Sequence, residues 1–273
     1  MSDNLDNNRF TRTFADLKAS GGKALMPFLT AGYPNIDATG ALLKDFEARG
    51  VKICEVGFPF SDPIADGPTI QASYTVALDA GLTVQNILDM VAAYRAGGGK
   101  MALAAMVSYS IVFRHGTEAF MSQLVEAGFD ACIIPDLPLD EAAGAEALAS
   151  AAGLCNVMLI APTTPPDRRV EIAKHCRGFT YFVSITGITG ERVSLPQETI
   201  DGVAELRRHT DTPVCVGFGI SNAETVKTVC DAADGAIVGS AIIHRITDAI
   251  DLPSDQMVAK VGDFVSELLT PII

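Results

Sequence analysis

The run CEVGFPFSDPIADGPTIQ, residues 54–71, contains the end of a strand, a loop and the start of a helix. The segment Val51–Gly57 is apolar apart from two charged residues and lacks strict alternation, which is typical of a strand buried on both faces. A loop rich in Pro and Gly follows, and Pro68 suits the first position of a helix. Glu55 lies inside the buried strand, where an unpaired charge is costly. Its presence therefore requires an explanation.

This strand–helix unit recurs along the chain. Eight apolar segments are expected to form strands: Ala24–Thr30, Val51–Gly57, Met101–Val107, Ala131–Pro135, Asn156–Ile160, Phe179–Ile185, Val214–Gly217 and Gly235–Val238. Segments with apolar residues three or four apart are expected to form helices: Asp37–Arg49, Val84–Ala96, Gly116–Ala127, Leu139–Ala151, Pro166–His175, Pro196–His209 and Asn222–Ala232.

Eight such units predict one α/β domain over residues 1–273, a closed (β/α)₈ TIM barrel. An open, doubly wound sheet is the alternative. Arg9–Ser20 is expected to form an extra N-terminal helix across the bottom of the barrel, and residues 254–269 a terminal helix.

The composition limits the partners and the compartment. The 273 residues carry a net charge of −13, so nucleic acid and anionic membranes are not expected to bind. The sequence shows neither a secretory signal nor an apolar run of transmembrane length. The six cysteines form no CxxC pair and lie mostly in apolar segments. Reduced thiols in a cytoplasmic protein are therefore expected.

Three carboxylates belong to the second strand and the loop after it. Active sites of such barrels lie at the carboxyl ends of the strands, which places Glu55, Asp62 and Asp66 at the catalytic face. Each has a structural alternative: an ion pair with an arginine for Glu55, a turn for Asp62 and a helix cap for Asp66. Tyr181 in the sixth predicted strand is either a second group facing this cavity or a core aromatic.

Glycines follow the last three predicted strands, in the loops Thr186–Gly190, Gly217–Ser221 and Gly239–Ser240. Glycine lets backbone N–H groups approach an anion, and the start of a helix adds a favourable dipole. The pattern predicts a phosphate site built from the backbone, with tight turns as the alternative. Phe28 and Phe218 are candidates for an apolar pocket beside it or for the core.

Lysine and metal chemistry are not expected at this face. Lys23, Lys52 and Lys100 lie at or just before the starts of strands, which is the opposite end of the barrel. No two histidines have the spacing of metal ligands, so no metal site is predicted. The carboxylates remain as the acid and base groups.

The stretch from Glu55 to Pro63, continued by Asp66–Gln71, closely resembles the signature of the tryptophan synthase α subunit family. Further segments agree with the family and cover nearly the whole chain from about Arg9 onward: Pro27–Pro34, Pro135–Pro138, Gly187–Gly190 and Val216–Ser221. The resemblance implies a (β/α)₈ lyase that cleaves indole-3-glycerol phosphate to indole and glyceraldehyde 3-phosphate.

The resemblance also implies roles for individual residues. Glu55 takes the acid/base role, Asp66 steadies the ring nitrogen, and Tyr181 lies beside them. The remaining positions correspond to substrate-binding residues of the family: Phe28 and Phe218 around indole, Gly190, Gly219, Gly239 and Ser240 at the phosphate, and Thr189 as a contact of the catalytic aspartate. One position departs from some members, which carry Arg where Ile185 follows Ser184.

The family further implies a partner, a β subunit that binds pyridoxal phosphate in an αββα complex, and no cofactor in this chain. The loop with Pro59, Phe60 and Asp62 corresponds to the part that contacts this partner. Two other functions stay open beside the lyase. One is another phosphate-binding barrel, such as a sugar-phosphate isomerase or epimerase, and the other is a non-catalytic activating subunit.

Overall fold

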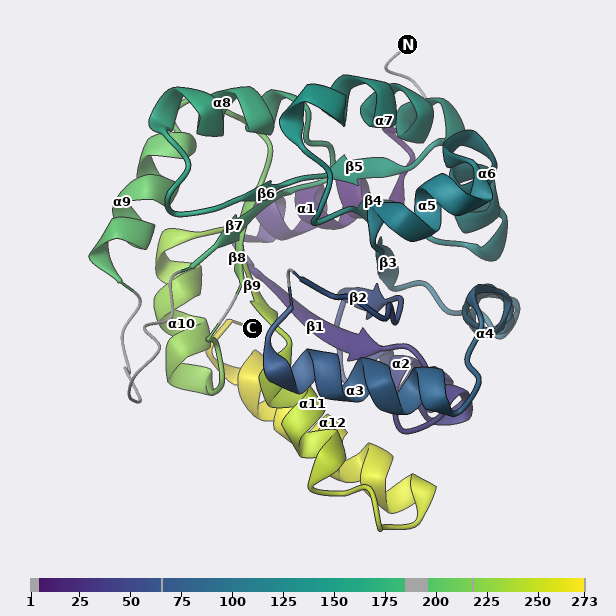
Figure 1. Cartoon of the computed structure of the whole chain (residues 1–273). Helices are drawn as coiled ribbons and strands as arrows, with labels where there is room; N and C mark the ends of the chain where they lie inside the picture. Colours follow the sequence, from purple (N-terminus) through teal and green to yellow (C-terminus); the bar gives the residue numbers. More distant parts are fainter. Residues whose placement is uncertain (1–4, 65, 185–195, 218, 273) are drawn as a thin grey trace.

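The structure is a computed structural model that describes residues 5–64, 66–184, 196–217 and 219–272. Its strands run parallel inside a layer of helices (Figure 1). The strands are β1 Ala24–Thr30, β2 Ile53–Gly57, β3 Ala102–Met106, β4 Ala131–Ile133, β5 Cys155–Val157, β6 Leu159–Ile160, β7 Thr180–Val183, β8 Val214–Gly217 and β9 Gly235–Val238. They are ordered β5-β4-β3-β2-β1-β9-β8-β7-β6.

The fifth predicted strand is divided at Met158 into β5 and β6. β5 pairs with β4, whereas β6 pairs with β7, and the Met158 carbonyl accepts a hydrogen bond of 3.1 Å from the Tyr181 N–H. The two ends of the sheet therefore belong to one short segment, which brings the sheet round into a barrel. The predicted (β/α)₈ barrel is confirmed, and the division at Met158 accounts for the ninth strand.

The helices lie outside the strands, as their apolar spacing predicted. They are α1 Arg9–Ser20, α2 Ile36–Ala48, α3 Pro68–Asp79, α4 Val84–Ala96, α5 Tyr109–His115, α6 Thr117–Ala127, α7 Leu139–Ala152, α8 Pro166–Lys174, α9 Gln197–Leu206, α10 Ala223–Ala232, α11 Ser240–Thr247, α12 Ser254–Leu269 and the short 3₁₀ helix η1 Thr270–Ile272. In the described part of the chain, no single helix is long and apolar enough to cross a membrane, and only the bent pair α3 and α4 passes that test jointly.

The predicted N-terminal helix covers the bottom of the barrel. Phe10, Phe14 and Leu17 of α1 are buried, and the ring of Phe10 stacks on Phe179 with centroids 5.8 Å apart. Asn8 accepts a hydrogen bond of 2.8 Å from the Phe10 N–H, which caps the helix. This helix thus closes the end of the barrel opposite the predicted site.

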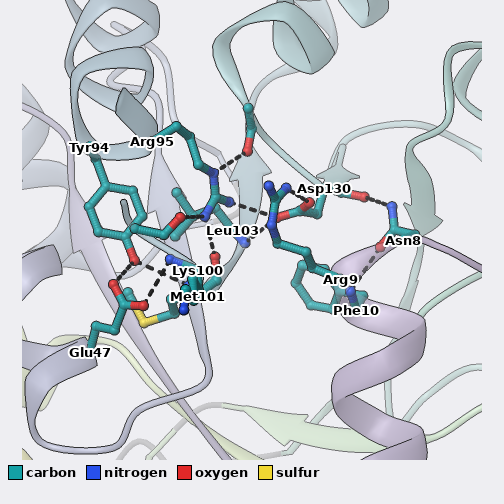
Figure 2. Close-up of polar contacts among 12 residues, drawn as sticks. Asn8, Arg9, Phe10, Glu47, Tyr94, Arg95, Lys100, Met101, Leu103 and Asp130 are labelled. Atoms are coloured by element: carbon teal, nitrogen blue, oxygen red, sulfur yellow. Dashed lines mark hydrogen bonds and ion pairs between the residues drawn. The ribbon is translucent and has the colours of Figure 1, made fainter. Parts of the chain in front are cut away.

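A buried aspartate joins α1 to the strands at this end (Figure 2). Asp130, 4% exposed, accepts hydrogen bonds from Arg9 at 2.7 Å, from Arg95 at 2.8 Å and from the Leu103 N–H at 2.9 Å. Asn8 also donates to the Asp130 carbonyl at 2.7 Å. Both carboxylate oxygens of Asp130 are therefore bound by donors from three separate elements.

Lys23 also lies at the bottom, as predicted. Its Nζ donates to the Ala233 carbonyl at 2.6 Å and lies 3.8 Å from the Asp234 carboxylate. Lys52 and Lys100 are exposed and lie one and two residues before β2 and β3. None of these lysines is available to the opposite face of the barrel.

Candidate active site

A cavity of about 590 Å³ opens at the carboxyl ends of the strands. It brings together most of the residues that the sequence singled out: Phe28, Glu55, Asp66, Tyr181, Gly219, Gly239 and Ser240. Thr189, Gly190 and Phe218, also predicted for the site, lie outside the described residues. Aromatic and aliphatic side chains form much of the remaining wall, which suits an apolar ligand with one polar end.

Glu55 lies in the middle of β2 and is fully buried. Among the described residues, neither of its carboxylate oxygens has a hydrogen-bond partner, and no arginine there forms an ion pair with it. Burial, and to a smaller extent the nearby Asp66 carboxylate, raises the pKa of Glu55 to about 8. A buried carboxyl with a pKa above neutrality and no partner is typical of a proton-transfer group.

Asp66 does not cap a helix. α3 begins at Pro68 with Gly67 as its N-cap residue, and no side chain makes a capping hydrogen bond there. The Asp66 carboxylate lines the cavity instead, and its pKa is raised to about 6, first by burial and then by Asp136. The Gln71 side chain holds the loop from α3 by donating to the Asp66 carbonyl at 2.8 Å. The capping interpretation is therefore wrong, because the cap is backbone only.

Tyr181 lies in β7 and its ring is buried. This side chain forms part of the cavity wall. A side chain at Gly217 of β8 would overlap the Tyr181 hydroxyl, so glycine leaves the room that this phenol occupies. Burial raises the pKa of Tyr181 well above its usual range, and Glu55 and Asp66 add to this. The phenol therefore stays protonated beside the two carboxylates.

The glycines of the described loops line one part of the cavity. Gly219 has a φ of +76°, a conformation that favours glycine, and Gly239 directly precedes the first residue of α11, Ser240. Backbone N–H groups at the start of a helix are unpaired within the helix and favour an anion. This part of the cavity suits a phosphate group.

Two basic residues of α11 also line the cavity and were missed in the sequence. His244 Nε2 lies 3.2 Å from the Thr69 hydroxyl, and the Arg245 guanidinium lies over the Phe264 ring at 4.6 Å. The helical spacing from Ser240 to His244 was the available signal, because residues four apart share a helix face. The described cavity therefore combines backbone donors with basic side chains.

The loop between β2 and α3 was predicted to contact a partner. Asp62 is exposed and Phe60 is half-buried, but Pro59 is buried, so its ring does not belong to the exposed surface. Ile64, which was not singled out, is 78% exposed. The apolar part of this loop that faces outward is thus Ile64 with parts of Phe60 and Pro63.

Metal ligands do not gather in the described part of the chain. No group of three or more His, Cys, Asp or Glu residues there is arranged to hold a metal ion. The six cysteines are all buried and unpaired with one another. The polar groups of the cavity include the two carboxylates, the phenol, the backbone donors, the side chains of Ser221 and Ser240 and the basic residues of α11.

Comparisons with known proteins point to one family. The family model described as tryptophan synthase alpha chain matches residues 14–270. The tryptophan synthase alpha chain of Rhodopirellula baltica is 43% identical, with 93% of this chain and 95% of the relative covered. That of Chloroflexus aggregans is 44% identical, with 96% and 97% covered.

Solved structures are similar over the same length. The tryptophan synthase subunit alpha of Legionella pneumophila strain Paris superposes with a TM-score of 0.88 at 32% identity, covering 97% of this chain and 98% of that one. A chain of the aminoacrylate-bound tryptophan synthase of M. tuberculosis has a TM-score of 0.86 at 30% identity, covering 97% and 100%. The chain belongs to the tryptophan synthase alpha chain family.

Proposed function

We propose that this tryptophan synthase alpha chain cleaves indole-3-glycerol phosphate to indole and glyceraldehyde 3-phosphate with Glu55 as its acid and base. The observation that supports this role is the buried Glu55 carboxyl, which faces the cavity without a partner among the described residues and has a pKa of about 8. At neutral pH it is mainly protonated, which is the form that the first step requires.

The reaction needs no lysine because the indole ring accepts the electrons. Glu55 donates its proton to ring carbon C3, which converts the ring to an indoleninium cation. The Glu55 carboxylate then removes the proton of the hydroxyl on the adjoining side-chain carbon. The bond between this carbon and C3 breaks, its electrons return to the ring, and the side chain leaves as the aldehyde. Glu55 ends the cycle protonated, as it began.

Asp66 stabilises the cation in this scheme. Its pKa of about 6 leaves it mainly ionised at neutral pH, and it lines the same cavity as Glu55. A carboxylate that accepts a hydrogen bond from the ring N–H stabilises positive charge as it develops on the nitrogen. Asp66→Asn keeps the shape but removes the charge, so it is expected to lose most of the turnover.

The rest of the cavity binds the two ends of the substrate. Phe28 packs against the indole ring, and Tyr181 lies beside the reacting carbon. Gly219, Gly239 and Ser240 donate backbone N–H groups to the phosphate. By resemblance, Phe218 also borders the ring, Gly190 belongs to the phosphate site and Thr189 contacts Asp66.

Glu55→Gln tests the central assignment. Purified chain is mixed with indole-3-glycerol phosphate, indole release is followed, and substrate binding is measured separately. The variant is expected to lose turnover by about 10²–10⁴-fold while its substrate dissociation constant changes little. Wild-type turnover in this variant would contradict the assignment, and no turnover in either protein would contradict the lyase function in favour of an activating subunit.

We also propose that the chain works in the cytoplasm with a β subunit that supplies pyridoxal phosphate, in an αββα complex, and binds no cofactor itself. The exposed Asp62 and the half-buried Phe60 support this, because they place a charged and an apolar group on one loop beside the cavity. Asp62→Ala is expected to weaken binding to the β subunit, measured by titration, with less effect on the turnover of the isolated chain.

A further inference from the structure

His244 and Arg245 are the basic side chains that line the cavity in the part of the chain that the structure describes. They differ in what they already contact. The Arg245 guanidinium lies over the Phe264 ring of α12 and 3.9 Å from Asp248, which follows the last residue of α11. His244 has one hydrogen-bond partner, Thr69, and its side chain is exposed to the cavity opening. His244 is therefore the basic group that remains available to a ligand.

The position of His244 in α11 directs its ring toward the proposed phosphate site. Ser240 begins this helix and His244 follows four residues later, so the two lie on the same face about 6 Å apart along the axis. Side chains of a helix lean toward its N-terminus. The imidazole thus extends over the first turn, where Ser240 and Gly239 present their N–H groups.

Thr69 determines which nitrogen faces the ligand. It lies in the first turn of α3, which packs against α11 (Figure 1). When the Thr69 hydroxyl donates to His244 Nε2, the neutral ring carries its proton on Nδ1. The described residues offer this ring no other hydrogen bond. In this tautomer Nδ1–H remains as a donor.

We propose that His244 binds the phosphate of the substrate and makes the site selective for phosphorylated ligands. The proposal deepens the proposed function, since it uses the phosphate position at Gly219, Gly239 and Ser240. A phosphate dianion approaching a chain of net charge −13 is repelled overall, so a local hydrogen-bond donor offsets part of that repulsion. In this proposal the phosphate site consists of backbone N–H groups and the His244 side chain.

Two isosteric variants separate the nitrogens of the ring. His244→Gln places an amide where Nε2 contacts Thr69 and removes the Nδ1 donor, whereas His244→Asn keeps an N–H donor near the Nδ1 position. We compare kcat/KM for indole-3-glycerol phosphate with that for indole-3-glycerol, which lacks the phosphate. His244→Gln is expected to lower kcat/KM for indole-3-glycerol phosphate by about tenfold or more and to leave kcat/KM for indole-3-glycerol unchanged. His244→Asn is expected to retain most of kcat/KM for indole-3-glycerol phosphate.

Binding without turnover provides the second measurement. The dissociation constant of glycerol 3-phosphate, measured by calorimetry, is expected to rise by the same factor in His244→Gln. Lys227→Gln serves as the control for a substitution outside the cavity, because Lys227 is exposed on α10 and its ion-pair partner among the described residues is Asp231. This control is expected to bind as the wild type does.

The outcomes distinguish the proposal from others. Equal losses with both substrates would overturn it and assign His244 to holding α3 and the Asp66 loop. Unchanged constants in His244→Gln would overturn it outright. If the lyase function itself fails, no indole forms from wild-type protein, yet the glycerol 3-phosphate measurement still reports on His244.

Discussion

Asp130 and Glu55 are both carboxylates enclosed by the barrel, 4% and 0% exposed; Asp130 lies at the bottom, whereas Glu55 faces the cavity at the opposite side. Asp130 directly precedes β4 and accepts hydrogen bonds from two arginines and a backbone N–H. Glu55 lies within β2 and has no such partner among the described residues. A satisfied buried network stabilises a fold, whereas an unsatisfied carboxyl destabilises it and is kept for chemistry. The two ends of this barrel are thus built for different purposes.

The largest expected effect concerns activity at the upper end. Glu55→Gln, which loses turnover in the scheme above, is expected to unfold at the same or a higher temperature than the wild type, because it removes a group whose ionised form is costly to bury. Turnover and thermal unfolding are measured on the same preparation. A large fall in melting temperature would show that Glu55 has a structural role, as Asp130 does, and would contradict the difference proposed between these two carboxylates.

Asp130→Ala is expected to have the opposite result. It leaves Arg9 and Arg95 without their shared partner and is expected to lower the free energy of unfolding by about 3–5 kcal/mol. Turnover per folded molecule is expected to stay near the wild-type value, because the change lies at the far end of the strands. Urea unfolding gives the free energy of unfolding. The measured turnover is divided by the fraction of folded protein to give turnover per folded molecule.

The pH dependence of stability sharpens the comparison. Glu55 binds its proton more tightly in the folded state, with a pKa of about 8 against an ordinary value of 4.5, so the folded protein loses stability relative to the unfolded chain as the pH rises through this range. The difference in unfolding free energy between Glu55→Gln and wild type is expected to grow by about a few kcal/mol from pH 5 to pH 8. Urea unfolding across this range measures it, and a constant difference would contradict the raised pKa.

The smallest expected effect is that of Arg9→Gln. The Arg9 side chain is 38% exposed, and Arg95 still binds Asp130 in this variant. We expect a loss of about 1 kcal/mol or less, as for other partly exposed ion pairs. A loss as large as that of Asp130→Ala would show that α1 depends on this contact alone.

Much of the fold was predictable because the apolar segments buried on both faces have a clear composition. β1, β8 and β9 have the predicted bounds, as do α1, α4 and α12. The division at Met158 was not predicted, because a residue that changes its pairing partner between two strands has no distinctive composition. α5, which follows β3, was missed because it is short.

The site was predictable where a residue type conflicts with its surroundings. Glu55 stands out because a carboxylate in an apolar strand has few structural explanations. Asp66 was less clear, since Asp before Gly-Pro fits a helix start equally well, and only the structure shows that its side chain makes no cap. His244 gave no such conflict, because a histidine on the exposed part of a helix is ordinary.

The division at Met158 has a consequence for the order of assembly. Within the set β1 to β5, and within the set β6 to β9, each strand pairs with strands that are adjacent in the sequence. The exception is the contact between the two sets, where Ala24 of β1 pairs with Gly235 of β9 across most of the chain. Contacts of such large sequence separation form late, since they require closure of a long loop. On the ribosome, we expect two half-barrels to form first and the seam between β1 and β9 to close only when the chain is nearly complete.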